Sequence, residues 1–309
     1  MSTAAIGDIG RLGLGCAPLG NLFDVVTDET ALATVDAAWD RGVRLFDTAP
    51  LYGHGLSELR VGRALASRPR DEYVLATKVG RLLEPVEADE VGDTIFADVP
   101  PLRPVFDFSH DGVLRSVEAS LQRLGVDRVD VLHVHDPDDH LDVAEAEAFP
   151  ALVRLREEGV IGAVGLGTNL PSVADRFVGR VDLDWLLLAG RCTLLDRSGI
   201  EVFERCADLG VRALAAGVFN SGVLAAPHEG AAFHYAPVPD PVLARARAMD
   251  ACCREHDVPL AAAALQFPLR TRGVDTVLVG ARTPGEVGRD AELLDLEVPP
   301  ELWSALDAA

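Results

Sequence analysis

The sequence lacks the features that would anchor the protein in a membrane or export it. No uninterrupted apolar run reaches the roughly 18 to 20 residues of a membrane span. The first ten residues show neither a basic start nor a long apolar run. The five cysteines are an odd number and contain no CxxC pair. This pattern predicts free thiols in a reducing compartment, so we expect a cytoplasmic protein with no membrane partner.

Basic residues are also scarce. The 28 Lys and Arg residues stand against 49 Asp and Glu residues, which gives a formal net charge of −21. Because phosphate binding needs clustered Lys and Arg, we expect no nucleic-acid partner. The acidic residues are spread along the chain, as on a solvated surface. With 309 residues, 49% of them apolar, the chain can form a full hydrophobic core in one large domain or two smaller ones.

Short apolar runs alternate with longer segments of helical pattern. The runs are continuous rather than alternating, which is typical of strands buried on both faces of a parallel sheet. They cover residues 11–16, 44–48, 73–78, 129–135, 162–168, 183–189, 211–216 and 275–281. Several helical segments end in a Gly that suits the left-handed position after a helix. In the helix over 111–125, the spacing predicts one apolar face formed by Leu114, Val117, Leu121 and Leu124.

Eight strands with intervening helices in about 300 residues predict a (β/α)8 barrel, an α/β fold, as one domain over residues 1–309. The rival is a doubly wound sheet, whose first helix normally opens with a GxGxxG pattern. The glycines of "GLGCAPLGN" do not fit that pattern, and a proline interrupts them. We therefore prefer the barrel. The irregular segment 81–108 is then expected to be a long loop on the face where the strands end, covering the site.

Four polar residues stand at or just after the ends of consecutive predicted strands. Asp47 ends the second strand and Tyr52 follows it, Lys78 ends the third strand, and His135 ends the fourth. A single strand-end Asp is often only a cap, and a single Lys often only reaches solvent. Active sites of barrels lie at the C-terminal ends of the strands. We therefore expect these four side chains to converge on one rim.

The four residue types have a joint chemistry. Tyrosine is a poor acid or base near neutral pH because its pKa is about 10, and a nearby ammonium is expected to lower that value by roughly 1 to 3 units. Lys78 supplies such a charge, and Asp47 is expected to pair with Lys78. His135 is expected to orient a substrate oxygen beside Tyr52. The set suits proton transfer at a carbonyl or an alcohol.

A metal site is the competing interpretation of the same segment. His133 and His135 form an HxH pair, and acidic residues and a further histidine follow in "DPDDH". Both His side chains fall on one face of the strand, but the later strands end in "GLGTN", "LLLAG" and "VLVGA", which offer few further ligands. We therefore predict no metal.

The chain resembles the aldo-keto reductases from roughly residue 10 to its end. The resemblance rests on "FDTAPLYGHGLSELRVGRAL", "VLATKVG", "SVEASLQRLGVDRVDVLHVHD", "LVRLREEGVIGAVGLGTN" and "DTVLVGARTPGEV". In that family Asp, Tyr, Lys and His form a catalytic tetrad, and they fall on Asp47, Tyr52, Lys78 and His135. The strand-end argument and the resemblance thus select the same four residues.

The resemblance also implies a nicotinamide cofactor, since the family binds one without a GxGxxG motif. It implies that Thr168 and Asn169 lie near the nicotinamide carboxamide. The segment 217–225 is implied along the pyrophosphate, and the residues after the last strand are implied at the adenosine phosphate, where a helix start suits an anion. The cofactor-binding residues that the resemblance predicts are Thr168, Asn169, Phe219, Asn220, Ser221, Gly222, Leu224, Gly280, Arg282, Glu286 and Asp290.

Three departures from the family pattern bear on the cofactor. Ala189 and Cys192 stand where relatives often have Gln and Tyr, and Phe219 is the candidate for the aromatic residue that often stacks on nicotinamide. Glu286 stands where NADP-preferring relatives often carry Arg, and a carboxylate repels a 2′-phosphate. Arg282 lies nearby in the sequence, and a contact between its positive charge and the 2′-phosphate would reverse the preference in favour of NADP. We expect NAD as the cofactor, with NADP as the alternative.

Within the family the chain is most similar to the L-fucose and D-threo-aldose 1-dehydrogenases, which oxidise a cyclic aldose at C1 to a lactone. Pyridoxal 4-dehydrogenase shares much of the pattern and also acts on a cyclic hemiacetal. The resemblance therefore implies an NAD(P)-dependent aldose dehydrogenase with a small-molecule substrate and Tyr52 as general base. The alternatives are a pyridoxal dehydrogenase, a general NADPH-dependent carbonyl reductase, and a binding subunit that senses cofactor without significant turnover. The oligomeric state stays open.

Overall fold

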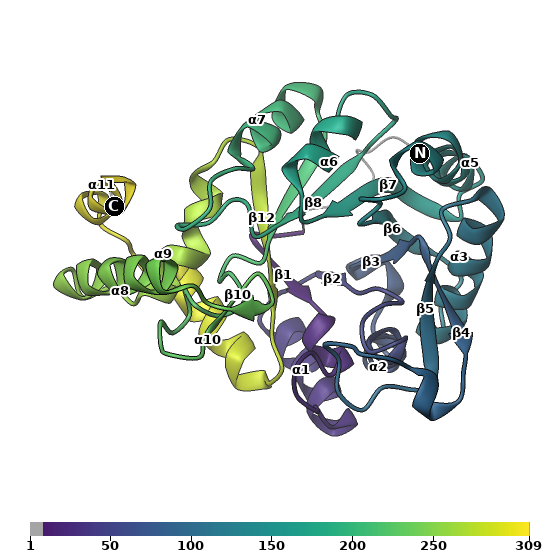
Figure 1. The fold of residues 1–309 in the computed structure, drawn as a ribbon, viewed down its shortest axis with the longest axis horizontal. Helices are drawn as coiled ribbons and strands as arrows, with labels where there is room; N and C mark the ends of the chain where they lie inside the picture. Colours follow the sequence, from purple (N-terminus) through teal and green to yellow (C-terminus); the bar gives the residue numbers. More distant parts are fainter. Residues whose placement is uncertain (1–8, 309) are drawn as a thin grey trace.

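The eight apolar runs form the strands of a closed parallel barrel in the computed structural model, which describes residues 9–308 (Figure 1). The strands pair in the order β1-β12-β9-β8-β7-β6-β3-β2, and β2 closes the barrel on β1. Their bounds are β1 Leu12–Gly15, β2 Leu45–Asp47, β3 Val74–Val79, β6 Val129–His135, β7 Ile161–Thr168, β8 Trp185–Ala189, β9 Arg212–Ala216 and β12 Val274–Gly280. The predicted (β/α)8 fold is therefore confirmed, and the doubly wound alternative is wrong.

Helices surround the barrel on its outside (Figure 1). Those that connect the barrel strands are α1 Asp28–Asp40, α2 Leu56–Leu65, α3 His110–Leu124, α4 Leu141–Val143, α5 Phe149–Glu157, α6 Pro171–Phe177, α7 Ile200–Leu209, α8 Asp240–Glu255 and α9 Leu260–Gln266. Two more follow the last strand, α10 Pro284–Asp295 and α11 Pro300–Ala308. In Figure 1, α8, α9 and α11 lie together at one side of the barrel. No helix among residues 9–308 combines the length and the apolar composition needed to cross a bilayer.

The continuous apolar runs are explained by burial on both faces of the sheet. β3 is buried at every position, and β6 and β7 are buried at all but one position each. One apolar cluster fills the inside of the barrel and includes Leu45, Val131, Trp185, Leu214 and Leu278. A larger cluster lies between the barrel and the helices. The barrel interior is thus a packed core, and the cavity described below lies at its rim.

The predicted apolar face of α3 is confirmed at Val117, Leu121 and Leu124, which are buried or pack against the core, but not at Leu114. Leu114 is 38% exposed, whereas Val113 and Val117 are buried. The helix packs its small residues inward, because α2 approaches closely: a Cβ on Gly62 would lie 2.2 Å from the backbone oxygen of Leu124. The small residues Gly112, Ser116 and Ser120 of α3 are also buried. Periodicity alone did not reveal this small-residue face.

The segment 81–108 is more regular than the predicted loop. It contains a hairpin in which β4 Arg81–Pro85 pairs with β5 Leu102–Phe106, antiparallel. A second small hairpin, β10 Ala232–Phe233 with β11 Ala236–Pro237, forms in the excursion after β9. Both excursions contribute residues to the cavity described below, so segment 81–108 lies at the cavity, as expected.

Candidate active site

The loop after β2 fixes the position of Tyr52. The three residues that follow Tyr52, Gly53, His54 and Gly55, all have positive φ. Gly53 has no alternative, because a Cβ there would lie 2.4 Å from the backbone oxygen of Gly20. His54 is buried, and its Nδ1 lies 2.6 Å from the backbone oxygen of Leu102 in β5. The "YGHG" sequence therefore turns the chain sharply and ties the turn to the β4–β5 hairpin.

Buried polar residues of α2 connect this loop to the neighbouring strands. Ser57 donates to the backbone oxygen of Cys16 at 2.7 Å, and its hydroxyl lies 2.8 Å from that of Thr48. Glu58 is fully buried and accepts from Thr77 in β3 at 2.7 Å and from Arg123 in α3 at 2.6 Å. The "SE" at the start of α2 thus holds β2 and β3 in place, which are the strands that carry Asp47 and Lys78.

Lys78 is the only lysine of the chain, and it is 1% exposed. Its Nζ donates to Asp47 Oδ2 at 2.6 Å and to the backbone oxygen of Thr48 at 2.8 Å. It also lies 4.7 Å from the ring centroid of Tyr52. The expected pair of Asp47 and Lys78 is therefore present. Burial raises the pKa of Asp47, and the Lys78 ammonium opposes that rise.

The expected effect on Tyr52 is wrong in its direction. Burial raises the pKa of Tyr52 well above its usual value, and the negative charges of Asp47 and Asp136 add to the rise, as does Tyr235. Loss of hydration at a buried phenol outweighs the attraction of a cation that is already paired with Asp47. Without other bound groups, Tyr52 is therefore a neutral phenol at neutral pH.

The two histidines of the HxH pair have different surroundings. His135 lines the cavity with its ring edge-on to Tyr52, at a centroid distance of 5.9 Å. Burial and the cations Arg81 and Lys78 hold the pKa of His135 well below its usual value, so its imidazole is neutral. His133 lies deeper, 0% exposed, with Nε2 3.9 Å from Asp47 Oδ1 and no hydrogen bond to either ring nitrogen.

A metal centre is not formed around this pair. Within residues 9–308, no group of three or more His, Cys, Asp and Glu side chains is placed to hold a metal ion. His133 instead fills space inside the barrel against β7, where a Cβ on Gly165 would lie 2.2 Å from His133 Nδ1. The absence of a side chain at Gly165 therefore makes room for the buried imidazole of His133.

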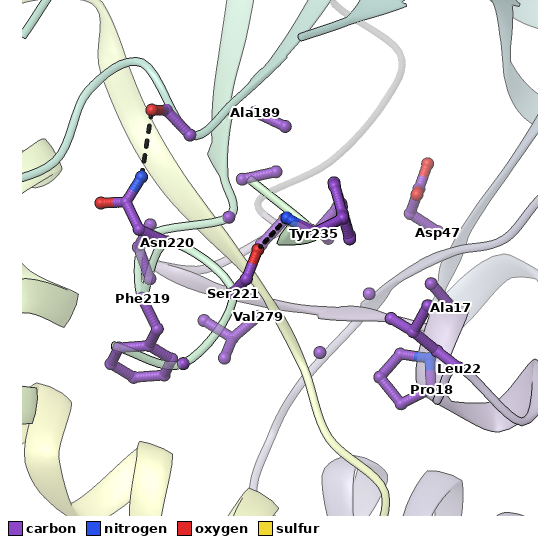
Figure 2. A pocket seen from close by; sticks show the side chains of 18 of the residues that line it. Ala17, Pro18, Leu22, Asp47, Ala189, Phe219, Asn220, Ser221, Tyr235 and Val279 are labelled. Carbon is purple, nitrogen blue, oxygen red and sulfur yellow. Dashed lines mark hydrogen bonds between the residues drawn. The ribbon is translucent and has the colours of Figure 1, made fainter. Parts of the chain in front are cut away.

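The four expected rim residues line one cavity of about 600 Å³, shown from close by in Figure 2. Asp47, Tyr52, Lys78 and His135 all lie on its wall. Ten of the predicted cofactor-binding residues line the same cavity: Thr168, Asn169, Phe219, Asn220, Ser221, Gly222, Gly280, Arg282, Glu286 and Asp290. Leu224, which we also predicted, is fully buried in the apolar core. The cavity thus joins the four rim residues to the segments after β9 and β12.

The walls of the cavity fit an elongated polar group such as a nicotinamide dinucleotide. Figure 2 shows Asn220 donating to the backbone oxygen of Gly190, and the Tyr235 amide donating to Ser221 Oγ, at 3.3 and 3.0 Å. Asn220 Oδ1 is buried and has no hydrogen-bond partner, so it can accept from a bound ligand. Arg282 and Glu286 line the cavity near the start of α10. This end is therefore polar and charged.

Glu286 and Arg282 both have hydrogen-bond partners within the protein. Glu286 Oε2 accepts from the backbone amide of Arg282 at 2.6 Å, and the Arg282 guanidinium donates to Asp24 at 2.6 Å. The Arg282 side chain is thus paired with a carboxylate. Burial and the neighbouring Glu286 raise the pKa of Asp290 to about 7.

Several cavity residues were missed by the sequence reasoning. Asp136 and Arg289 line the cavity beside residues that were predicted, and Phe96 comes from the segment 81–108. The signal for Asp136 was its position directly after His135. Arg191 does not follow any predicted pattern, yet it donates to the backbone oxygen of Asn169 at 2.7 Å and contacts His234 in the β10–β11 hairpin.

The structure shows where the residues lie at which the chain departs from the family pattern. Ala189 and Phe219 both line the cavity, and Cys192 is buried with its sulfur 3.4 Å from the Thr271 hydroxyl. All five cysteines are free, as predicted. Burial raises the pKa of Cys192 to about 11, so it is a neutral thiol at physiological pH and not a reactive thiolate.

Fold and cavity together define a (β/α)8-barrel protein with Asp, Tyr, Lys and His side chains clustered at the strand ends, beside a site suited to a nicotinamide cofactor. Residues 11–309 match the aldo/keto reductase family. The chain belongs to that family, whose members are oxidoreductases that use NAD(P)(H).

Individual relatives agree with this assignment. The chain is 45% identical to a D-threo-aldose 1-dehydrogenase of Pseudomonas sp. over 97% of this chain and 94% of that protein. It is 39% identical to a pyridoxal 4-dehydrogenase of Microbacterium luteolum over 96% and 92%. Among solved structures it is similar to a glycerol dehydrogenase of Gluconobacter oxydans, with a TM-score of 0.78 and 25% identity over 100% of this chain and 95% of that one.

Proposed function

We propose that this protein is an NAD(P)-dependent aldose 1-dehydrogenase, which oxidises a cyclic aldose of the L-fucose or D-threo type at C1 to its lactone. The observation that carries the proposal is the meeting of Asp47, Tyr52, Lys78 and His135 at the wall of one cavity that also holds the predicted cofactor residues. The 45% identity to a D-threo-aldose 1-dehydrogenase supports the choice of substrate.

The side chains suit the proton movements of this reaction. A bound oxidised nicotinamide would supply the acceptor for the hydride of C1. Tyr52 takes the proton of the C1 hydroxyl, so that the C–O single bond becomes the carbonyl of the lactone. His135, held neutral by burial, orients the reacting oxygen. Asp47 holds Lys78 at the ring of Tyr52, where its charge favours the ionised phenol.

The raised pKa of Tyr52 has a consequence for the pH dependence. A base acts in its deprotonated form, so oxidation becomes faster as the pH rises toward the pKa of Tyr52. Donation of a proton in the reverse direction uses the neutral phenol and does not need a high pH. We therefore expect kcat/KM for oxidation to rise between pH 7 and pH 9.

We propose NAD as the preferred cofactor. Thr168 and Asn169 would hold the nicotinamide end, the segment 217–222 the pyrophosphate, and Arg282, Glu286 and Asp290 the adenosine end. The carboxylates of Glu286 and Asp290 disfavour a 2′-phosphate, and the Arg282 guanidinium is already paired with Asp24 at 2.6 Å. The free thiols support a reducing compartment such as the cytoplasm.

A pyridoxal 4-dehydrogenase is the second candidate, favoured by the 39% identity to such an enzyme and by the aromatic side chains Phe23, Phe96 and Tyr235 in the cavity. A general NADPH-dependent carbonyl reductase would reduce simple aldehydes better than it oxidises sugars. A cofactor-sensing subunit would bind the cofactor and turn over neither kind of substrate. These alternatives differ in measurable turnover, so one panel separates them.

The test is the absorbance of reduced nicotinamide with purified protein, NAD⁺ or NADP⁺, and L-fucose, L-galactose, D-arabinose, D-glucose or pyridoxal. We expect turnover of L-fucose and D-arabinose with NAD⁺. Glu286→Arg, with Glu292→Arg as a control for added charge on the same helix, is expected to raise the affinity for NADP⁺. Turnover of pyridoxal alone would replace the substrate, and cofactor binding without turnover would favour the sensor.

A further inference from the structure

One carboxylate beside the four rim residues is only loosely held by the protein. Asp136 Oδ2 lies 3.4 Å from Arg81 Nη2 and 3.5 Å from His135 Nε2, and Oδ1 lies 3.4 Å from Asn169 Nδ2. Charge-assisted hydrogen bonds are normally about 2.7–2.9 Å long. Asp136 lines the cavity, so its oxygens retain acceptor capacity on the cavity wall.

The backbone holds this carboxylate in an unusual place. Asp136 has a φ of 43°, and its amide donates to the backbone oxygen of Gly167 at 2.9 Å. A left-handed conformation costs free energy for a residue with a side chain, and such residues are common at functional sites. The turn directs the carboxylate of Asp136 back toward the imidazole of His135, the residue before it.

Burial adds to the cost of this arrangement. The side chain of Asp136 is 17% exposed, and burial raises its pKa, although the Arg81 guanidinium opposes the rise. The protein therefore does not fully replace the water that the carboxylate has lost. A ligand hydroxyl would supply the missing short hydrogen bond.

We propose that Asp136 is a specificity-determining residue, which accepts a hydrogen bond from the substrate hydroxyl on the carbon next to the reacting carbon. This inference rests on the proposed function, because it takes the reacting oxygen to lie at Tyr52 and His135. Asp136 Oδ2 is 3.5 Å from His135 Nε2, so a hydroxyl that neighbours the reacting one falls within reach. Arg81 and Asn169 orient the carboxylate, and the Arg81 guanidinium opposes the rise in its pKa.

Other parts of the cavity wall have a different character. Leu22, Phe23, Ile95 and Phe96 contribute apolar and aromatic surface to it. A cyclic aldose presents hydroxyls along one edge and C–H groups on a face, which suits one polar and one apolar wall. In pyridoxal, the ring carbon next to the reacting carbon carries no hydroxyl. Asp136 therefore favours aldoses over pyridoxal as substrates.

The test compares L-fucose with 2-deoxy-L-fucose, which lacks the hydroxyl in question. For the wild-type enzyme, kcat/KM is expected to fall roughly 10- to 100-fold when that hydroxyl is absent, as for a hydrogen bond to a charged group. Asp136→Ala is expected to lose the same factor on L-fucose and almost nothing further on 2-deoxy-L-fucose. Asp136→Asn, which keeps the shape of the side chain, is expected to lose part of it. Asp139→Asn is the control, since Asp139 is exposed in the same loop.

The ratio between the two sugars separates binding from support of His135. A purely structural role would slow both sugars by the same factor and leave their ratio unchanged, which would overturn the inference. If the wild type oxidises L-fucose but Asp136→Ala keeps the wild-type ratio of kcat/KM between the two sugars, this inference is wrong and the proposed function stands. A wild-type enzyme that oxidises no aldose rejects the proposed function and this inference together.

Discussion

Asp47 and Asp136 are two carboxylates at the same end of the barrel, and the protein surrounds them in opposite ways. Asp47 is 1% exposed and accepts from Lys78 at 2.6 Å. The carboxylate of Asp136 has its partners at 3.4 to 3.5 Å and lies on the cavity wall. A carboxylate that is tightly paired with a buried cation positions that cation, whereas a loosely held one remains available to a ligand. We therefore propose that Asp47 supports the chemistry through Lys78 and that Asp136 selects the substrate.

The largest expected effect comes from breaking the tight pair. Lys78→Met leaves the Asp47 carboxylate buried without its cation, which typically costs about 3–5 kcal/mol of unfolding free energy. Asp136→Asn is expected to cost about 1 kcal/mol, because its hydrogen bonds are long. Urea unfolding at pH 8 measures both. Equal losses in the two variants would remove the contrast between the carboxylates.

A matched double variant tests the reason for that loss. Lys78→Met combined with Asp47→Asn removes the uncompensated charge, so the double variant is expected to be more stable than Lys78→Met alone. The penalty of Lys78→Met should also shrink at pH 5, because burial raises the pKa of Asp47 and the unpaired carboxylate then takes up a proton. A penalty that does not change with pH would point to lost packing instead.

The second Asp47 oxygen, Oδ1, lies 3.9 Å from His133 Nε2. Replacing His133 is expected to have an intermediate effect on the pH dependence of the unfolding free energy. Burial lowers the pKa of His133 to about 3, below the 6.5 of an unfolded chain. The unfolded state therefore binds a proton that the folded state refuses, and stability falls as the pH drops below about 6.5. From pH 6.5 to pH 5 this one group contributes about 2 kcal/mol of the fall.

His133→Leu removes that contribution, so its unfolding free energy should decline less steeply over the same range. Urea midpoints at pH 6.5 and pH 5 give the comparison, with His228→Leu as the control for an exposed histidine. If His133→Leu declines as steeply as the wild type, His133 is protonated in the folded protein, and Asp47 has a second cationic partner.

Asp290 extends the comparison to a third carboxylate of the cavity, with the smallest expected effect. Its folded-state pKa is raised to about 7, so its relative stabilisation is complete below the unfolded pKa of about 4 and is lost as the pH rises through 7. Asp290→Asn is expected to be roughly 1–2 kcal/mol more stable than the wild type at pH 5.5 and about equal to it at pH 4. Thermal or urea unfolding at the two pH values checks this, and a difference at pH 4 of the same size would contradict it.

The barrel was predictable because burial on both faces leaves a direct trace in the sequence. The runs at 129–135 and 162–168 coincide with β6 and β7 to within one residue. The rim residues were predictable for a related reason, since parallel strands end at one face and bring their last residues together. Neither argument depends on contacts between distant segments.

What was missed depends on such contacts. The β4–β5 hairpin pairs residues that lie far apart in an irregular stretch, and the close approach of Gly62 to Leu124 joins two separate helices. The raised pKa of Tyr52 is a result of burial by several segments, which no motif records. Asp136 was visible only as one acid in "HDPDD", because its positive φ and its distance to His135 appear only in three dimensions.

We propose that Tyr52 moves the proton in an oxidation that Asp47, Lys78 and His135 support. The most direct measurement is the formation of reduced nicotinamide from L-fucose and NAD⁺ by the wild type and by Tyr52→Phe, with cofactor binding measured in both. The account predicts equal cofactor binding and a loss of roughly 10²- to 10⁴-fold in kcat for Tyr52→Phe, as for removal of a general acid–base group. Full turnover by Tyr52→Phe would contradict it.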